Sequence, residues 1–264
     1  MHTAMPADKK DPYIRLLVRE AIAPLRASAS DAAEMASQLL FGETCMRLQD
    51  QGNWLQVRRD FDGYEGWLDA KQVEAAPPDF SPSTDFCFVL SGSLILPDDT
   101  LMRLPLGTRL PKAALTGRFT WGGLTYQAGP DLKLTEVRPR EHLVKTATLF
   151  LNLPYLWGGL SGWGLDCSGL VQTAAAMCGL SLPRDSSQQA EVGEAIAWGQ
   201  QQAGDLAFLG KPGQNRITHV GILQDPHSIV HASGKVRLDP FDSTGITHSH
   251  SHHVTHHLLT MRRC

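Results

Sequence analysis

Short apolar runs separated by turn-forming residues characterise the first part of the chain. Four such runs occupy residues 14–18, 44–48, 54–57 and 66–68, and turn signals such as Asp50-Gln51-Gly52-Asn53 lie between them. Residues 31–40 (DAAEMASQLL) interrupt the pattern with a helix-forming composition and an acidic start, so we expect a short helix there. The pattern predicts a small β-barrel over residues 13–78.

A second set of short apolar runs follows a proline-containing linker. The linker comprises Pro77-Pro78 and Ser81-Pro82-Ser83, and the runs lie at residues 86–90, 94–96, 100–104, 119–121 and 132–137. Strands of this length and spacing predict a second small barrel over residues 79–137. The two units would share an architecture, although their sequences show little self-similarity.

The pattern changes again over residues 138–264. Residues 141–151 and 166–178 have a helical pattern, and Gly179 provides a stop for the second helix. Strand candidates follow at residues 205–209, 217–223, 228–232 and 236–238. Helices followed by a run of antiparallel strands predict an α+β domain in which helices pack on an antiparallel sheet.

Composition narrows the class of protein. The 264 residues are 42% hydrophobic and 19% charged, as in an ordinary soluble globular protein. A formal charge of −3 without a basic run argues against binding to nucleic acid or to an anionic membrane. No stretch approaches the ~20 apolar residues of a membrane span, and residues 1–12 lack the apolar core of a secretory signal. We therefore expect a cytoplasmic protein, or a periplasmic or secreted one if a signal peptide has been removed.

One cysteine has neighbours that suggest chemistry. The five cysteines are scattered and odd in number, which predicts reduced thiols and no disulfide framework: Cys45, Cys87, Cys167, Cys178 and Cys264. Cys167 follows a glycine-rich segment and opens the apolar helix, with Asp166 and Ser168 as acceptable caps. Backbone N–H groups and the helix dipole stabilise an anion at this position, so we expect a lowered pKa for the Cys167 thiol.

Two histidines are candidates for the base that such a nucleophile requires. If residues 217–223 and 228–232 form a hairpin across Gln224-Asp225-Pro226, residue 223 pairs with residue 227, and His219 lies directly opposite His231. Directly opposed side chains share one face of a sheet. One imidazole can then hydrogen-bond the other while the first faces the thiol. A lone strand histidine usually has only a structural role, but this pairing favours catalysis.

Six motifs resemble those of the NlpC-type cell-wall peptidases, a papain-like cysteine peptidase family. They are PYLWGG (154–159), DCSGLV (166–171), LPRDSSQQ (182–189), GDLAFL (204–209), HVGI (219–222) and IVHASG (229–234). With the segments between them they cover a little under half of the chain, in the order of the family. The resemblance implies that Cys167 is the nucleophile, His219 the base and His231 the residue that orients the base.

The N-terminal half resembles the paired bacterial SH3-like barrels of one branch of this family, through SQLLFGE (37–43), GNWLQV (52–57) and GYEGWL (63–68). Members of that branch are γ-D-glutamyl-L-diamino acid endopeptidases that recycle short murein peptides with a free N-terminal L-Ala. The resemblance places seven residues at the substrate: Tyr64, Tyr155, Trp157, Asp166, Ser168, Arg184 and Ser186. Asp166 would suit a substrate ammonium or simply cap the helix, and Arg184 would bind a carboxylate or form a structural ion pair. An acidic barrel residue should help to bind the amine, and the choice between Glu34 and Glu43 stays open.

The implied reaction is acyl transfer, which needs no metal and no cofactor. The Cys167 thiolate attacks the γ-glutamyl carbonyl, and backbone N–H groups, with that of Cys167 foremost, stabilise the oxyanion. His219 then protonates the departing amine, and water hydrolyses the thioester.

Other interpretations remain. The histidines at 248, 250, 252, 253, 256 and 257 suggest metal binding, but no carboxylate or cysteine is interleaved among them. The same Cys–His pair could serve an amidase or acyltransferase, and the barrels alone could make a non-catalytic wall-binding module. The sequence leaves open whether the diamino acid is diaminopimelate or lysine, and what the oligomeric state is.

Overall fold

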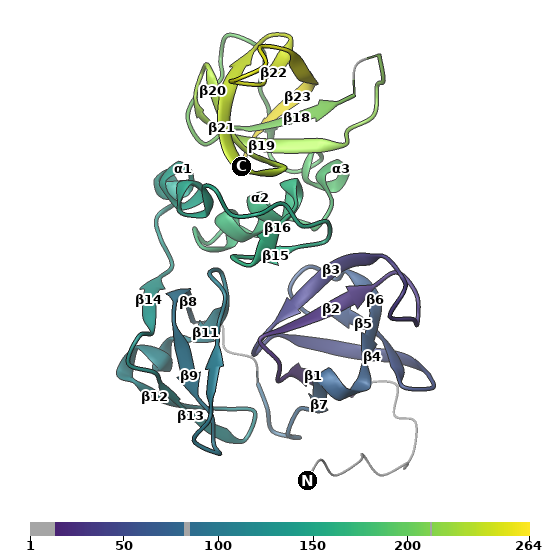
Figure 1. The fold of residues 1–264 in the computed structure, drawn as a ribbon, viewed down its shortest axis with the longest axis vertical. Coiled ribbons are helices and arrows are strands. Elements are labelled where there is room, and N and C mark those ends of the chain that lie inside the picture. The colour runs from purple at the N-terminus through teal and green to yellow at the C-terminus, as the bar shows by residue number, and fades with distance from the viewer. Residues whose placement is uncertain (1–13, 82–84, 212) are drawn as a thin grey trace.

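The structure is a computed structural model that describes residues 14–81, 85–211 and 213–264. The segment before residue 14, together with Pro82 and Ser83 of the expected linker, lies outside the described residues. Two N-terminal units of β-structure lie side by side below the C-terminal region, and the helices lie between these units and the C-terminal sheet (Figure 1). No helix among the described residues is both long and apolar enough to cross a membrane.

The first unit is one antiparallel sheet in the order β3-β2-β6-β5-β4-β1-β7. Its core is a cluster of buried apolar side chains that includes Leu16, Leu25, Leu39, Val57 and Leu68. The strands are β1 Arg15–Val18, β2 Ile22–Arg26, β3 Met35–Leu40, β4 Thr44–Gln51, β5 Trp54–Arg59, β6 Glu65–Asp69 and β7 Val73–Ala75, with a 3₁₀ helix at Ala70–Gln72.

The helix expected over residues 31–40 is wrong. Residues 31–33 form a turn, and β3 pairs with β2 from Ile22↔Leu40 to Arg26↔Met35. The four residues from Ser37 to Leu40 are all buried. Ladder hydrogen bonds and burial across the sheet therefore outweigh a weak local preference for helix.

The second unit consists of two small antiparallel sheets around one core. The sheet orders are β10-β9-β13-β12 and β11-β8-β14. The core includes Val89, Leu94, Leu110 and Phe119, and it also takes in Leu17 and Phe41 of the first unit. The elements are β8 Phe86–Ser91, β9 Ser93–Ile95, β10 Leu101–Arg103, β11 Arg109–Pro111, a 3₁₀ helix Lys112–Thr116, β12 Arg118–Trp121, β13 Leu124–Ala128 and β14 Lys133–Glu136.

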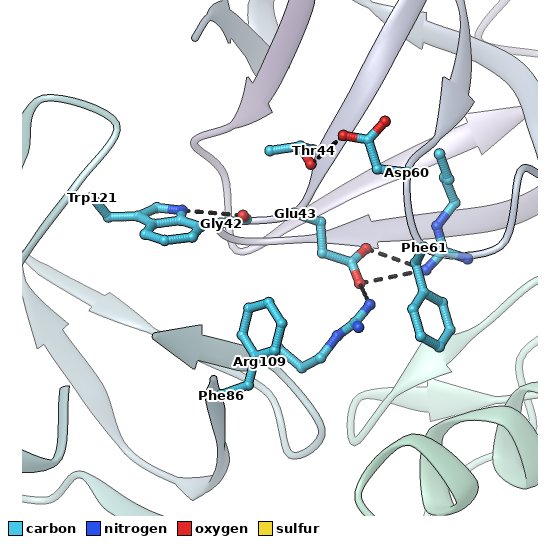
Figure 2. Close-up of a pocket in the computed structure, with 9 residues that line it drawn as sticks. Gly42, Glu43, Thr44, Asp60, Phe61, Phe86, Arg109 and Trp121 are labelled. Atoms are coloured by element: carbon cyan, nitrogen blue, oxygen red, sulfur yellow. Dashed lines mark hydrogen bonds and ion pairs between the residues drawn. The ribbon is translucent and has the colours of Figure 1, made fainter. Parts of the chain in front are cut away.

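A buried ion cluster joins these two units. Glu43 pairs with Arg59 at 3.3 Å and with Arg109 of β11 at 2.8 Å, and the Arg109 guanidinium lies 3.9 Å from the centre of the Phe61 ring. Figure 2 shows this cluster around a cavity of about 240 Å³ that Phe86 and Trp121 also line. Burial acts to raise the pKa of Glu43, but the two arginines hold it below its ordinary value. Glu43 is therefore a structural anion between the units.

The C-terminal region is a closed antiparallel barrel with few helices. Its strands run in the order β17-β23-β18-β19-β20-β21-β22, and β22 also pairs with β23, which closes the barrel. The helices are η3 Arg140–His142, α1 Leu143–Ala147, η4 Thr148–Phe150, α2 Cys167–Ala176 and α3 Ser186–Gln189. The strands are β15 Leu160–Ser161, β16 Gly164–Leu165, β17 Glu194–Ala195, β18 Leu206–Gly210, β19 His219–Asp225, β20 Ser228–Ser233, β21 Lys235–Asp242, β22 Gly245–Thr247 and β23 Val254–Arg263.

The expected packing of helices on an antiparallel sheet is confirmed only in part. The buried side of α2 packs with Val220, Ile222 and Val230 of the barrel wall. A second cluster, which includes Leu209, Leu223 and Ile229, comes from the alternate positions of the same strands and forms the interior of the barrel. Since α1 has only five residues, the helical layer is small and the sheet dominates the region.

Candidate active site

The cysteine of the DCSGLV motif is the first residue of α2, as the sequence predicts. Asp166 is the N-cap in extended conformation, and its Oδ1 accepts the backbone N–H of Gly169 at 2.7 Å. Its Oδ2 accepts the N–H of Gly158 at 2.9 Å, which holds the preceding glycine loop against the start of the helix. Gly158 has φ +77°, and a Cβ there would lie 2.3 Å from the carbonyl oxygen of Met35. Glycine therefore lets strand β3 of the first unit approach the loop that precedes Cys167 closely.

Arg184 fixes the same carboxylate from the other side. The guanidinium donates to Asp166 Oδ1 at 3.0 Å and Oδ2 at 2.5 Å, and it also donates to Ser168 Oγ at 2.8 Å. Its Nε donates to Ser37 Oγ of β3 at 3.1 Å, so the first unit contributes to this network. Arg184 is only 2% exposed. The sequence left two roles open for Arg184, a substrate contact and a structural ion pair. Its contacts in this structure are those of a structural ion pair with Asp166.

His219, His231 and Asp239 form a hydrogen-bonded chain, and His219 lines the same cavity as Cys167. His219 Nε2 lies 2.9 Å from His231 Nδ1, and His231 Nε2 lies 3.0 Å from Asp239 Oδ2. The expected register is wrong, because Gly221 and not His219 is paired with His231. The two histidines are diagonal neighbours on one face, which still allows their rings to meet.

The resting charge state of the pair differs from the expectation. Burial raises the pKa of Cys167 to about 11, and the nearby Asp166 adds to this, although backbone N–H groups of Val220 and Ser168 act to lower it. Burial, together with His256 and His231, lowers the pKa of His219 well below its ordinary value. The expected low pKa of the thiol is therefore wrong for the resting site, where both groups are neutral.

A cavity of about 750 Å³ gathers the residues that the sequence singled out. Cys167 and His219 line it, and the Cys167 thiol lies within reach of the backbone N–H of Val220, the residue after His219. All seven residues expected at the substrate also line the wall: Tyr64, Tyr155, Trp157, Asp166, Ser168, Arg184 and Ser186. His231 is buried behind His219, where it can act only through that ring.

The structure also brings residues to this site that sequence reasoning missed or left open. Glu34 lines the cavity and its Oε1 accepts the Trp157 Nε1–H at 2.5 Å, whereas Glu43 belongs to the cluster between the two N-terminal units. Further lining residues are Asp185, Lys211, Arg216 and His256. Sequence reasoning also missed Asp239. Its one signal is strand alternation: Asp239 is two residues after Arg237, which pairs with His231, so its side chain lies on the same face of the sheet.

The histidine-rich segment contributes one residue to this wall, His256. Among the described residues, no group of three or more His, Cys, Asp or Glu side chains is arranged to hold a metal ion. All five cysteines are free thiols.

Comparisons with known proteins match both ends of the chain. The sequence profile of the NlpC/P60 family matches residues 152–262, and that of the bacterial dipeptidyl-peptidase SH3 domain matches residues 25–73. A γ-D-glutamyl-L-lysine dipeptidyl-peptidase of Bacillus subtilis (strain 168) is 31% identical over 216 residues, which cover 74% of this chain and 71% of the relative. An enzyme of the same name from Bacillus cereus is 28% identical over 248 residues, covering 82% of this chain and 73% of that protein.

Solved structures agree on the fold. The crystal structure of an NlpC/P60 family protein from Bacillus cereus superposes with a TM-score of 0.77 at 21% identity, covering 94% of this chain and 99% of that one. An NlpC/P60 endopeptidase from Photobacterium damselae superposes with a TM-score of 0.71 at 16% identity, covering 89% of this chain and 68% of that one. At these identities the likeness shows a shared fold, a papain-like domain preceded by an SH3-like domain.

Proposed function

The chain belongs to the NlpC/P60 family of cysteine peptidases, and from this premise we propose that it hydrolyses the γ-D-glutamyl–diamino acid bond of short murein peptides with a free N-terminal L-Ala. The observation that carries the proposal is the composition of one cavity wall. Tyr64 and Glu34 of the first unit face the same cavity as Cys167. Because the first unit forms part of the cavity wall, we expect it to limit how much peptide fits on the amine side of the nucleophile. Such a site suits a short peptide and disfavours an intact wall strand.

The cavity wall carries the charge that a substrate ammonium requires. Glu34 and Asp185 supply carboxylates there, and the hydroxyl of Tyr64 is an additional hydrogen-bonding group. Asp166 is less suited to this role, because it already accepts hydrogen bonds from Gly158, Gly169, Ser168 and Arg184. We assign the ammonium to Glu34, with Asp185 nearby, and assign to Asp166 the task of holding the start of α2.

The reaction begins from a neutral Cys167 thiol and a neutral His219 imidazole. His219 accepts the thiol proton as Cys167 Sγ attacks the γ-glutamyl carbonyl carbon, so thiolate formation and attack are coupled. The carbonyl oxygen becomes an oxyanion, which the backbone N–H of Cys167 stabilises. His219 then returns the proton to the nitrogen of the diamino acid, which leaves as the C–N bond breaks. Water hydrolyses the thioester and releases L-Ala-γ-D-Glu and the free thiol.

The leaving diamino acid would occupy another part of the cavity. Lys211 and Arg216, in the connection between β18 and β19, line the cavity and are exposed. Their charges suit the carboxylates of the departing residue, of which diaminopimelate carries one more than lysine does. Two relatives are named for an L-lysine bond. Both diamino acids should therefore be tested as substrates.

We also propose that the chain divides into domains at residues 13–78, 79–137 and 138–264, and that the second unit is another SH3-like barrel. Its two small sheets around one core support this assignment. The assignment predicts that residues 1–137 form a stable pair of units, since the two share apolar contacts and the Glu43 cluster.

The proposal is tested with purified protein and L-Ala-γ-D-Glu-diaminopimelate or L-Ala-γ-D-Glu-L-Lys. Wild type should release the free diamino acid, and Cys167→Ala should release none. Cys178→Ala, which removes a buried thiol from the other end of the same helical segment, is the matched control and should retain activity. Acetylating the alanine amine should greatly reduce cleavage.

Other outcomes would support the rival functions. Cleavage that is indifferent to the acetyl group would remove the free-amine requirement and leave a less selective cysteine hydrolase, amidase or acyltransferase. Binding to intact sacculi with no product from either peptide would favour a wall-binding module.

A further inference from the structure

His256 presents its imidazole to the ring of His219. The two ring centroids are 4.0 Å apart and the planes differ by 22°, so the rings are stacked. His231 meets His219 at a centroid distance of 5.0 Å and an interplanar angle of 88°, which is an edge-on arrangement. The His219 ring is therefore held at its edge by His231 and on a face by His256.

We propose that His256 is a positioning residue, whose stacked ring holds the His219 imidazole in the orientation that serves Cys167; this rests on the proposed Cys167–His219 pair. The hydrogen bond from His219 Nε2 to His231 fixes one atom of the ring but leaves rotation about that contact free. A ring stacked on the imidazole face blocks this rotation. Nδ1 is the ring nitrogen that the bond to His231 leaves free to accept the thiol proton.

Two irregularities in the pairing of β23 lie close to His256. In the pairing with β22, the register shifts between Ile246 and Thr247, so Thr255 is an extra residue on β23. In the pairing with β18, the register shifts between Phe208 and Leu209, so Leu259 is another extra residue. A bulge redirects side chains and increases the local twist of a strand. Bulges lie before and after His256, so its side chain can point in a direction that a regular strand would not give it.

The charge state of His256 suits a ring that neighbours a base. Burial lowers the pKa of His256 to about 4, with His231 adding to this effect, and its Nδ1 lies 2.9 Å from Thr255 Oγ1. The neutral ring adds no positive charge beside His219 when His219 accepts the thiol proton. The other titratable or charged groups near His219 are Cys167 from α2, His231 backed by Asp239 and Arg237, and Lys211 and Arg216 on the cavity wall.

The test compares three variants by two independent readouts. His256→Ala removes the stack, His256→Phe keeps an aromatic ring that cannot titrate, and His257→Ala removes the exposed neighbour as a control. The first readout is the rate at which iodoacetamide alkylates Cys167, with Cys167→Ala as the blank. The second is kcat and KM for the murein tripeptide. Thermal unfolding verifies that each variant is folded, and His256→Gln replaces His256→Ala if that variant is not.

Misplacing the base should slow both reactions without changing peptide binding. For His256→Ala we expect alkylation and kcat to fall about 10-fold, with KM within about twofold of wild type. His256→Phe should restore at least half of each rate, and His257→Ala should match wild type. Wild-type rates in His256→Ala would overturn the proposal. Equal losses in the Ala and Phe variants would also overturn it, because the imidazole itself would then be required.

The rate of Cys167 alkylation tests the role of His256 independently of the proposed substrate. If wild type cleaves neither murein peptide, the substrate assignment is wrong, but the alkylation rates still report whether His256 positions the base.

Discussion

His219 bonds to His231 across a diagonal, because Gly221 occupies the position directly paired with His231. The hairpin turns at Pro226 and His227, and Gln224 forms a one-residue bulge; together they shift the pairing by two residues from the simplest register. A shift of two keeps every side chain on its face, whereas a shift of one would have moved His231 to the other side of the sheet. The His219–His231 hydrogen bond therefore depends on the register being shifted by an even number of residues.

The Asp239 carboxylate should be needed to orient His231. Asp239→Asn leaves the side-chain shape unchanged but removes the anion that accepts from the His231 ring. We expect kcat to fall by up to about 100-fold with little change in KM. Steady-state kinetics measure this, with Asp242→Asn, further along the same strand, as the control. An Asp239→Asn enzyme with wild-type kcat would remove Asp239 from the chain of orienting residues.

The buried Arg184–Asp166 pair should be required for stability. Arg184→Met leaves the Asp166 carboxylate buried without its cation, which costs about 3–5 kcal/mol in comparable pairs. Urea unfolding should show this loss, and Asp166→Asn in the same chain should recover part of it. Arg58→Met breaks an exposed pair with Glu65 and should cost less than about 1 kcal/mol. Equal stability of the two single variants would contradict this account.

Glu34 should set the preference for a free amine. Glu34→Gln keeps an acceptor for Trp157 but removes the charge that attracts an ammonium. KM for the free tripeptide should rise about 10-fold, since a charge-assisted hydrogen bond contributes about 1.5–3 kcal/mol. The acetylated peptide, which lacks the ammonium, should be cleaved no worse than by wild type. Glu191→Gln, on the surface, is the control, and an unchanged KM in Glu34→Gln would move the amine site elsewhere.

Arg216 should favour the leaving group with more negative charge. Arg216→Glu should raise KM more for the diaminopimelate peptide than for the lysine peptide, by a few fold because the side chain is exposed. The measurement is the ratio of kcat/KM for the two peptides, at low and at high salt. Arg118→Glu, on the second unit, should leave that ratio unchanged. A ratio that is also unaffected by Arg216→Glu would show that this cation does not contact the leaving group.

Stability should fall as the pH drops below about 6.5. His219, His231 and His256 all have folded pKa values below 6.5, and that of His256 is about 4. Between the unfolded and folded pKa values the unfolded state binds more protons, so the free energy of unfolding decreases as pH falls. Each fully buried histidine contributes up to about 1.4 kcal/mol per pH unit. The free energy of unfolding, measured from pH 4.5 to 7.5, should change less steeply with pH in His256→Phe than in wild type or His257→Phe. Identical slopes in the three proteins would contradict this prediction.

Local sequence was sufficient to place Cys167, the predicted nucleophile, at the start of a helix. A cap at Asp166, an apolar stripe and a stop at Gly179 lie within one short segment, so the start of α2 follows from nearby residues alone. The structure of residues 31–40 could not be predicted in this way, because their composition favours a helix. The strand β3 forms by pairing with β2, whose residues lie outside this segment.

The sequence by itself determined the order of the motifs and predicted Cys167 as the nucleophile and His219 as its base, because each depends on residue type and short spacing. Only the tertiary structure decided that the thiol and imidazole rest as a neutral pair, since burial depends on what packs around them. It also decided that Glu34 and not Glu43 faces the cavity, and that His256 stacks on His219. Those contacts join residues far apart along the chain, and barrel closure and strand bulges set their distances.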